Sequence, residues 1–303
     1  MENKSGTVLK KKSRSNRRRT LAVTLAAVLA AVVIPGLYSG LKLQHYDMYS
    51  HKLEKPIRIV LISDLHSCEY GQDEQKLISA IDEQNPDAVF MCGDIFDENR
   101  PDDNAEALIE GIGGRFPCWY VTGNHEYRVS GEVFSARMDL LEKYGIKRLD
   151  DEAVTVELNG QLVNLCGVND PVSGRLRGSY VPDALGSYRN SEYIDFVSKL
   201  LNVSENGAFT FLLAHRPEYY ETYFAGGCDL ALSGHAHGGQ WRIPGLVNGV
   251  FAPGQGFFPQ HAGGMYTEGE SALAVSRGLA RSALPIPRLY NRPELVVIDI
   301  MPQ

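Results

Sequence analysis

The sequence predicts an α/β fold in which two packed, mixed β-sheets are flanked by helices, preceded by one N-terminal transmembrane helix. In the first half of the chain, short apolar runs alternate with amphipathic stretches. This alternation is typical of βαβ units and of a parallel sheet covered on both faces. Further short strands follow a hairpin signal, with few helical periods. A hydrophobic content of 44% over 303 residues allows one large domain to bury such a core.

The N-terminus combines a basic tail with an apolar segment. Residues 1–19 carry eight Lys or Arg and one acid, a net charge of +7, so residues 20–303 carry −14 of the chain's total of −7. The segment from Leu21 to Leu41 has no charged residue. Its length of about 32 Å as a helix matches the hydrocarbon core of a bilayer. We therefore interpret residues 1–20 as a cytoplasmic tail and 21–42 as a single-pass anchor in the cell membrane, with the rest extracytoplasmic.

Other interpretations of this N-terminus stay open. A cleaved signal peptide is one, because the purest apolar run, Leu21–Ile34, is short and is interrupted by Pro35-Gly36. The absence of a small-x-small cleavage site after Gly36 favours an uncleaved anchor. Arg17-Arg18-Arg19 loosely resembles a twin-arginine export signal. The acidic body argues against a nucleic-acid partner, which needs positive charge along the phosphate path.

The rest of the chain is expected to be a tether over residues 43–56 and one domain over 57–303. Asn159-Gly160 predicts a hairpin turn, and Asp170–Asn190 a long loop. The expected helices are 74–84, 102–112, 132–144 and 191–201. The expected strands are 57–62, 88–92, 116–121, 153–158, 162–168, 209–214, 230–233, 273–276 and 295–300.

Five polar motifs follow these apolar strands. They are Asp64-Leu65-His66, Gly93-Asp94-Ile95-Phe96-Asp97, Gly123-Asn124-His125-Glu126, a lone His215, and Gly234-His235-Ala236-His237. Carboxyl ends of parallel strands meet at one edge of a sheet, so we expect these side chains to converge. Asp64 and His66 are expected on one side of an extended segment. Carboxylate, imidazole and amide ligands suit two divalent transition metals, with Mn, Fe, Zn and Co all possible.

In these motifs the chain resembles the calcineurin-like metallophosphoesterase superfamily over residues 57–300, and especially bacterial members with an N-terminal membrane segment or export signal. The resemblance implies a four-layer αββα sandwich. It also implies two metal sites that share Asp94: one formed by Asp64, His66 and His237, the other by Asn124, His215 and His235. His125 would lie beside the leaving group, and Asp97 would hydrogen-bond it and fix its tautomer. Glu126 is expected to be structural.

Such a site predicts a hydrolase. Two ions that share a water lower its pKa toward neutrality and offset charge on a phosphate, while His125 could donate a proton to the leaving group. We expect a metal-bridging hydroxide to cleave phosphodiester or pyrophosphate bonds. The substrate would be a phosphorylated small molecule, lipid-linked or nucleotide-linked, outside the cytoplasm, as for some members of that branch.

Two other functions stay open, a phosphomonoesterase and a non-catalytic metal-containing scaffold. The protein Ser/Thr phosphatase branch has an Arg where this chain has Glu98, which argues against a phosphoprotein substrate. Scaffold relatives tend to lose the histidine beside the leaving group, and this chain keeps His125. Asp97 could also be an ordinary solvated acid. The arginines of the long loop, Arg175, Arg177 and Arg189, could bind phosphate or lie in solvent.

Overall fold

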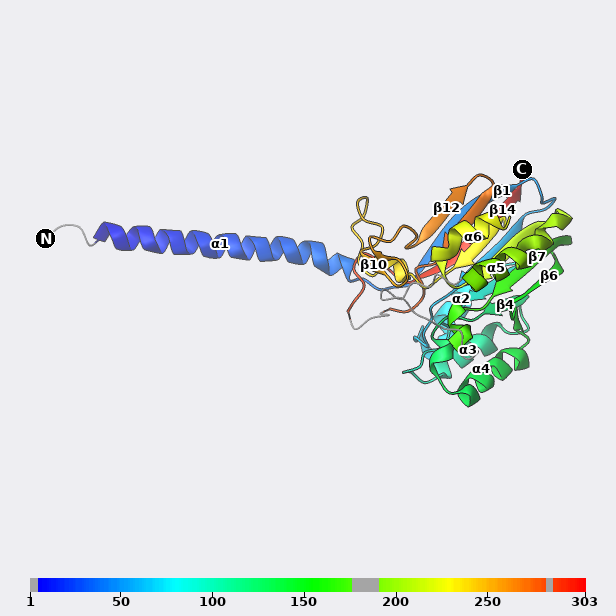
Figure 1. The fold of residues 1–303 in the computed structure, drawn as a ribbon. Helices are drawn as coiled ribbons and strands as arrows, with labels where there is room; N and C mark the ends of the chain where they lie inside the picture. The colour runs from blue at the N-terminus through cyan, green and yellow to red at the C-terminus, as the bar shows by residue number, and fades with distance from the viewer. Residues whose placement is uncertain (1–4, 176–190, 282–285) are drawn as a thin grey trace.

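The computed structural model describes residues 5–175, 191–281 and 286–303, in which two six-stranded sheets lie between layers of helices (Figure 1). The first sheet has the spatial order β1 (Lys42–Ser50), β14 (Glu294–Pro302), β2 (Ile57–Ile62), β3 (Ala88–Cys92), β4 (Cys118–Val121) and β5 (Lys147–Arg148). The second has the order β12 (Gly264–Glu268), β13 (Ser271–Val275), β9 (Leu230–Ser233), β8 (Phe209–Ala214), β7 (Gln161–Val168) and β6 (Glu152–Leu158). A small hairpin pairs β10 (Phe251–Ala252) with β11 (Gly256–Phe257).

Helices cover the outer face of each sheet. The helices after α1 (Ser5–Gly36) are α2 (Gln75–Asp82), α3 (Asp103–Ile112), α4 (Gly131–Lys143), α5 (Ser191–Leu200) and α6 (Tyr220–Ala225). Side chains of α2, α3 and α4 form one apolar cluster with the first sheet, and side chains of α5 and α6 form another with the second. A third cluster fills the space between the sheets. The predicted four-layer architecture is confirmed.

The alternation of side chains along the strands explains why the motifs follow continuous apolar runs. In β2, Ile59 and Leu61 point into the space between the sheets, whereas Val60 and Ile62 pack under the helices. All four are buried, because a parallel strand in such a sandwich is covered on both faces. The sequence therefore shows no polar alternation there.

The Asn159-Gly160 hairpin is confirmed. Both residues lie in the left-handed region, with φ of 46° and 71°, and they join the antiparallel strands β6 and β7. Positive φ at both central positions is the geometry of a tight hairpin turn.

The predicted tether over residues 43–56 is largely a strand. β1 pairs in parallel with β14, from Lys42 opposite Glu294 to Ser50 opposite Pro302. Along β1 exposed and half-buried residues mostly alternate, and only Met48 is buried. β1 is an edge strand with little apolar content, so its own sequence carries a weak signal. Its pairing partner lies about 250 residues further along the chain.

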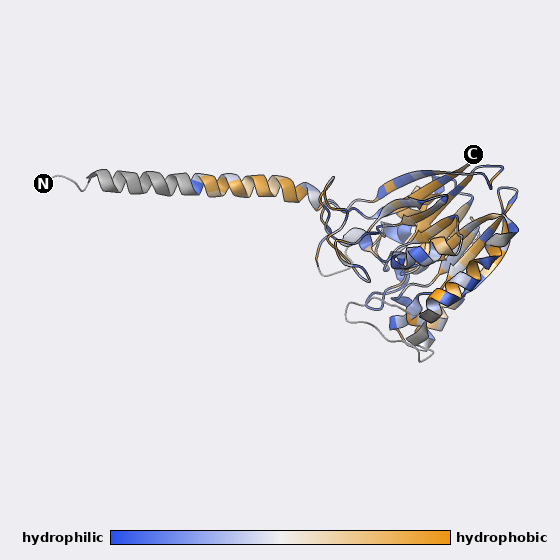
Figure 2. Ribbon diagram, turned by 45° about the horizontal axis from the view of Figure 1, so that its top comes forward, coloured by the Kyte–Doolittle hydropathy of each residue, from blue (hydrophilic) through white to orange (hydrophobic). Residues whose placement is uncertain are grey.

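The predicted anchor is shorter than expected at its C-terminal end. Helix α1 runs over Ser5–Gly36, and its portion Arg19–Gly36 is long and apolar enough to cross a membrane (Figure 2). Residues 37–42 of the predicted span 21–42 are not helical. The backbone N–H of Tyr290 donates to the carbonyl of Gly36 at 2.6 Å, and the Arg292 guanidinium donates to Gly40 at 2.9 Å. These contacts join the chain after the helix to the domain.

The predicted loop Asp170–Asn190 lies mostly outside the described residues, which hold its first part as a 3₁₀ turn, Pro171–Arg175. Arg177 and Arg189 lie outside the described residues as well.

Phe90 joins the two sheets, and we expect its truncation to be costly. Its ring lies 5.8 Å from Trp119 in the first sheet and 5.2 Å from Phe211 in the second. Phe90→Ala should lower the free energy of unfolding by about 3–5 kcal/mol through lost burial and a cavity. Urea titration of the purified protein measures this loss. Leu162→Ala on the exposed face of β7 is the control and should cost about 0.5 kcal/mol or less. Equal losses for the two variants would contradict this packing.

Candidate metal centre

Both sheets deliver polar side chains to one end of the sandwich. In the first sheet, Asp64 follows β2, Asp94 follows β3 and Asn124 follows β4. In the second sheet, His215 follows β8, and His235 follows β9. These strands are parallel within each sheet, so the side chains emerge at their carboxyl ends.

The Asp64–His66 segment is not extended, contrary to our expectation. Asp64 and His66 have φ of 50° and 48°, and Asp94, His235 and His237 are also left-handed, with φ of 53°, 65° and 47°. Non-glycine residues rarely adopt this conformation, and such strain concentrates at functional sites. Hydrogen bonds hold these turns: the amide of Asp64 donates to Gly93 and that of His66 donates to Asp94, both at 3.0 Å.

The turns bring the predicted residues into two clusters. Asp64, His66 and His237 form one cluster, and Asp94, His215 and His235 form the other; within each, the possible ligand atoms lie within 4.8 Å of one another. The Oδ2 atom of Asp94 lies 3.1 Å from Nε2 of His215 and 3.7 Å from Nε2 of His66. Asp94 therefore belongs to the second cluster and also faces His66 of the first, as a ligand shared by two ions would.

The donor set fits metal ions. The side-chain oxygen of Asn124 is buried and has no hydrogen-bond partner among the described residues, so a cation would satisfy it. Nitrogen atoms of two histidine pairs face each other, at 3.3 Å between His66 and His237 and 3.2 Å between His215 and His235. Lone pairs that converge in this way suit a shared positive charge.

Without metal, protons partly balance the charge of the centre. Burial disfavours a charged His215, but the charge and hydrogen bond of Asp94, together with the charges of Asp64 and Asp170, raise the pKa of His215 to about 10. Burial raises the pKa of Asp64, and the neighbouring Asp94 raises it further. Burial also lowers the pKa values of His235 and His237 well below the ordinary value, so both rings are neutral and suited to bind metal.

Hydrogen bonds from outside the clusters orient two of the rings. His66 Nδ1 lies 3.1 Å from the Asp97 carboxylate, and His215 Nδ1 lies 2.8 Å from the carbonyl of Cys92. Both contacts fix the proton on Nδ1 and leave Nε2 facing Asp94. Burial opposes ionisation of Asp97, but its hydrogen bonds to His66 and to the amide of Asn99, with the charges of His66 and His125, lower the pKa of Asp97 to about 2.

The predicted bond between Asp97 and His125 was wrong. Asp97 lies 3.8 Å from His125 Nδ1, whereas Glu98 contacts the same nitrogen at 2.5 Å. The other nitrogen, Nε2, lies 2.9 Å from the Arg128 guanidinium, which also pairs with Glu98 at 3.2 Å. Burial lowers the pKa of His125. The turn after β3 directs Asp97 to His66 and Glu98 to His125.

The sequence does not predict the contributions of Glu98 and Arg128. In the sequence Glu98 stands out only as a departure from a related motif. Arg128 lies three residues after His125 in one 3₁₀ turn, Glu126–Arg128. That spacing is a weak signal, because many surface arginines lie three residues from a histidine.

Glu126 holds the turns that follow β3 and β4. Its buried carboxylate accepts hydrogen bonds from the backbone N–H of Asp94, Ile95, Phe96 and Gly123, at 3.0, 2.9, 3.3 and 2.8 Å. Four donors on one carboxylate fix the backbone that carries Asp94 and Asn124. The expected structural role of Glu126 is confirmed.

Gly123 and Gly234 allow the turns to approach one another. A Cβ atom on Gly123 would lie 2.2 Å from Oδ1 of Asp94, and one on Gly234 would lie 2.3 Å from Oδ2 of Asp64. Only glycine fits this close to the two carboxylates.

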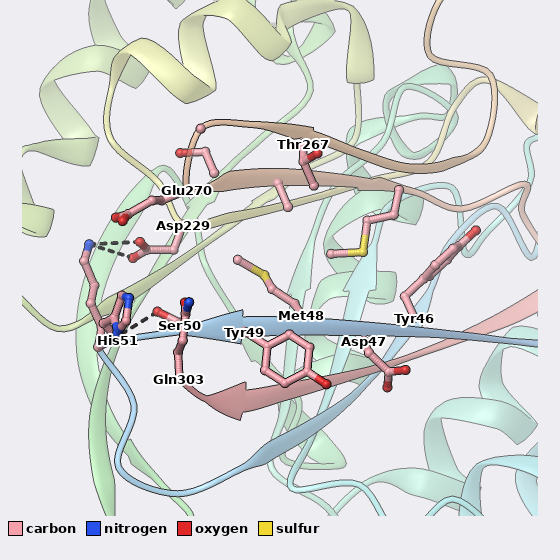
Figure 3. A pocket seen from close by; sticks show the side chains of 15 residues that line it. Tyr46, Asp47, Met48, Tyr49, Ser50, His51, Asp229, Thr267, Glu270 and Gln303 are labelled. Atoms are coloured by element: carbon pink, nitrogen blue, oxygen red, sulfur yellow. Dashed lines mark hydrogen bonds and ion pairs between the residues drawn. The ribbon is translucent and has the colours of Figure 1, made fainter.

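A separate cavity of about 510 Å³ lies at the other end of the sheets, between β1 and the β12–β13 hairpin (Figure 3). Asp229, which lines it, precedes β9, whereas His235 follows β9. Lys52 pairs with Asp229 there at 2.9 Å. None of the predicted site residues lines this cavity.

Comparisons with known proteins agree with the geometry. A family model described as calcineurin-like phosphoesterase matches residues 57–239. An uncharacterized metallophosphoesterase of Helicobacter pylori strain J99 is 30% identical over 212 residues, covering 68% of this chain and 52% of that protein. The phosphodiesterase YaeI of Escherichia coli K12 is 26% identical, covering 94% of this chain and 99% of its own length.

Two further comparisons concern a membrane protein and a solved structure. A transmembrane protein with a metallophosphoesterase domain from Danio rerio is 29% identical, covering 94% of this chain and 63% of that protein. The structure of YfkN, a calcineurin-like phosphoesterase from Bacillus subtilis, has a TM-score of 0.43 at 15% identity, covering 81% of this chain and 84% of that one. The chain thus spans about half of the Helicobacter relative and 63% of the Danio relative.

Metal affinity should rise with pH. The pKa of His215 is about 10 in the metal-free protein, so a proton must leave this ring before it can bind metal. Between pH 7 and 9 the deprotonated fraction rises about tenfold per unit, and the apparent affinity for Mn²⁺ should rise by about the same factor. Calorimetry in two buffers of different ionisation enthalpy measures the affinity and the released proton. His51→Asn, at an exposed position, is the control. An affinity that is flat over this range would contradict the prediction.

Proposed function

The chain belongs to the calcineurin-like phosphoesterase family and is a metal-dependent phosphoesterase, and from this premise we propose that it cleaves phosphodiester or pyrophosphate bonds in a lipid-linked or nucleotide-linked substrate outside the cytoplasm. The observation that carries the proposal is the pair of His/Asp clusters that meet at Asp94 beside His125. The name phosphodiesterase of the Escherichia coli relative supports the diester class.

The chain's own residues divide the work. Asp64, His66 and His237 would hold one divalent ion, Asn124, His215 and His235 the other, and Asp94 both. When bound, such ions supply a water of near-neutral pKa and offset charge on the phosphate oxygens. Asp97 keeps the His66 ring oriented for its ion. Oxygen and nitrogen ligands of this kind accept Mn, Fe, Zn or Co, so the metal identity is part of what the experiment must establish.

His125 is the proton donor in this proposal. Its Nε2 atom lies 3.9 Å from Oδ2 of Asp94, so the ring faces the point where the clusters meet. Glu98 holds Nδ1 at 2.5 Å and thereby reserves Nε2 for the leaving-group oxygen. Burial lowers the pKa of His125 in the free protein, and the negative charge of a bound phosphate would favour the protonated ring.

Arg128 is a phosphate-binding residue in this proposal. Its side chain is 44% exposed at the edge of the site and contacts Nε2 of His125 at 2.9 Å. An incoming phosphate oxygen would compete for this guanidinium and release the imidazole nitrogen. Glu98 takes the position of the arginine found in the Ser/Thr phosphatase branch, so Arg128 provides a guanidinium from another turn.

The position of α1 favours a membrane-linked substrate. The helix ends at Gly36, which is bonded to Tyr290, and the adjacent Asn291 donates to the carbonyl of His237 at 2.7 Å. The end of α1 and the candidate metal centre therefore lie at the same end of the sandwich. Figure 1 shows α1 meeting the domain beside β10. The basic residues before the apolar stretch favour an extracytoplasmic domain. The membrane assignment in the name of the Danio relative is consistent with an anchor.

A substrate panel tests the proposal. The full chain in detergent, stripped and reconstituted with Mn²⁺, is assayed on a chromogenic phosphodiester, a phosphomonoester and a nucleotide-sugar pyrophosphate. We expect diester or pyrophosphate turnover that is lost in Asp94→Ala. Monoester turnover alone would replace the proposal with a phosphatase. Two bound metals without turnover on any substrate would favour a scaffold.

The roles of the two neighbouring acids can be separated. His125→Ala and Glu98→Gln should both retain metal. Both should lose turnover on substrates with poor leaving groups, by about 10²–10⁴-fold for His125→Ala. Both should lose much less turnover on a substrate with a nitrophenyl leaving group. Asp97→Asn should instead weaken metal affinity by about 10–100-fold, because it orients His66. Metal content and leaving-group dependence are measured together, with Glu132→Gln, an exposed acid on α4, as control. A leaving-group effect in Asp97→Asn but not in Glu98→Gln would contradict the assignment.

A further inference from the structure

An exposed apolar surface lies immediately after the last of the five polar motifs. It consists of Trp241, Ile243, Leu246, Phe257 and Phe258, which we call the apolar rim. Leu246, Phe257 and Phe258 are 84%, 74% and 70% exposed. Elsewhere on the described part of the domain, exposed large apolar residues are few: Leu43 and Tyr49 on β1, Val133 on α4, Leu162 on β7, and Ile286. Five exposed large apolar side chains on one loop indicate an interaction site.

The rim belongs to an ordered loop. The amide of Val250 donates to Gly239 at 2.9 Å, and the amide of Phe258 donates to Val250 at 2.8 Å. The Trp241 indole donates to the carbonyl of Pro287 at 2.9 Å. The rings of Phe251 and Phe257 lie 5.4 Å apart. These contacts hold the backbone of the loop that carries the exposed rim side chains.

The rim adjoins the end of α1. Trp241 pairs with Leu289 in an isolated parallel β-bridge, and the amide of Arg242 donates to the carbonyl of Leu289 at 2.9 Å. The next residue, Tyr290, donates to Gly36 at the end of the helix. Figure 1 shows the same proximity, with β10 beside the domain end of α1. Tyr290 therefore joins the end of α1 to the segment that contacts the rim. The apolar side chains of the rim lie where the membrane-spanning stretch would leave the bilayer. Leu37 and Tyr38, which directly follow α1, are exposed as well.

Basic groups accompany the rim. Lys42, Arg242, Arg277 and Arg292 are all partly exposed. Burial lowers the pKa of Lys42, and the charges of Arg277, Arg242 and Arg292 lower it further, against the single acid Glu294. Arg242 follows Trp241 in the rim loop, and the Arg292 guanidinium donates to the carbonyls of Gly40 and Leu41, directly before Lys42. Aromatic and aliphatic side chains beside basic groups are typical of surfaces that bind the interface of an anionic bilayer.

We propose that the apolar rim inserts into the bilayer leaflet on the side of the domain, next to the end of α1. This second membrane contact holds the metal centre at the level of the lipid headgroups. Gly238 and Gly239 join His237 directly to the rim loop, and Gly239 packs on Gly249 within it. Insertion of the rim thus sets the depth of His237. The substrate class that fits is a phosphodiester or pyrophosphate whose lipid part stays in the bilayer. This inference rests on the proposed anchor and deepens the proposed function.

Tryptophan fluorescence tests the insertion independently of catalysis. The chain has two tryptophans; Trp119 is buried in the core at 4% exposure and Trp241 lies on the rim at 44%. The full chain is reconstituted into vesicles of phosphatidylcholine and phosphatidylglycerol, with or without bromine on the acyl chains. In Trp119→Phe, which leaves Trp241, bromolipids should reduce emission by about half or more. In Trp241→Phe, which leaves Trp119, emission should stay unchanged.

Absence of quenching of Trp241, in protein that resists carbonate extraction, would overturn the inference and leave the anchor intact. Release of the protein by carbonate would overturn the anchor and the inference together. Spontaneous disulfide formation between copies of Leu246→Cys in vesicles, with Trp241 unquenched, would replace the bilayer with a second copy of the chain as the occupant.

A functional measurement separates the rim from the active site. The double variant Leu246→Asp with Phe258→Asp should lower turnover of a vesicle-embedded phosphodiester by about fivefold or more, and that of a water-soluble diester by less than about twofold. The matched control, Val133→Asp with Leu162→Asp, carries the same charges on distant elements and should leave both rates unchanged. Equal losses on both substrates would overturn the inference. Absence of turnover in the unmodified protein would overturn the proposed function, and the fluorescence result would then decide whether the rim inserts into the bilayer.

Discussion

The arrangement depends on two carboxylates, Asp64 and Asp94, that are fully buried at the point where the sheets meet. Two buried like charges are unfavourable unless donors and positive charge compensate them. The backbone amide of His235 donates to Asp64 at 3.0 Å, and that of His125 donates to Asp94 at 2.8 Å. His215 adds positive charge in the metal-free protein. The left-handed turns and the closely packed glycines after the strands of both sheets bring these donors within reach of the carboxylates. The strained backbone that shapes the centre therefore also provides the hydrogen bonds that stabilise its buried negative charge.

Much of this could be predicted from the sequence, because each polar motif follows a strand that is buried on both faces and therefore reads as an apolar run. Ala88–Cys92 and Phe209–Ala214 were predicted to the residue, and the side chains after them converge as expected. β1 was missed since its stability comes from pairing with β14 rather than from its own composition. The partner of His125 was missed because the direction of Asp97 and Glu98 depends on turn geometry, which spacing in the sequence does not specify.

The two ends of the sandwich differ in character. One end, where β2, β3, β4, β8 and β9 finish, holds the His/Asp clusters, the connection through Tyr290 to α1, and the apolar rim. The other end holds the cavity between β1 and the β12–β13 hairpin, together with the C-terminal residue Gln303. Because α1 and the rim share an end with the metal centre, an anchored domain would present that centre to the bilayer and the cavity to the solvent beyond it.

The pairing of β1 also limits how the domain can be released from its helix by proteolysis. Lys42 to Ser50 lies in register with the whole of β14, whose residues are mostly buried and apolar. A cut beyond Lys42 would remove strand residues and leave β14 as an uncovered apolar edge, which is a template for aggregation. A protease can therefore free an intact domain only by cutting within residues 37–41, between the end of α1 and the start of β1. A domain released in this way would begin within residues 37–41 and keep the whole of β1.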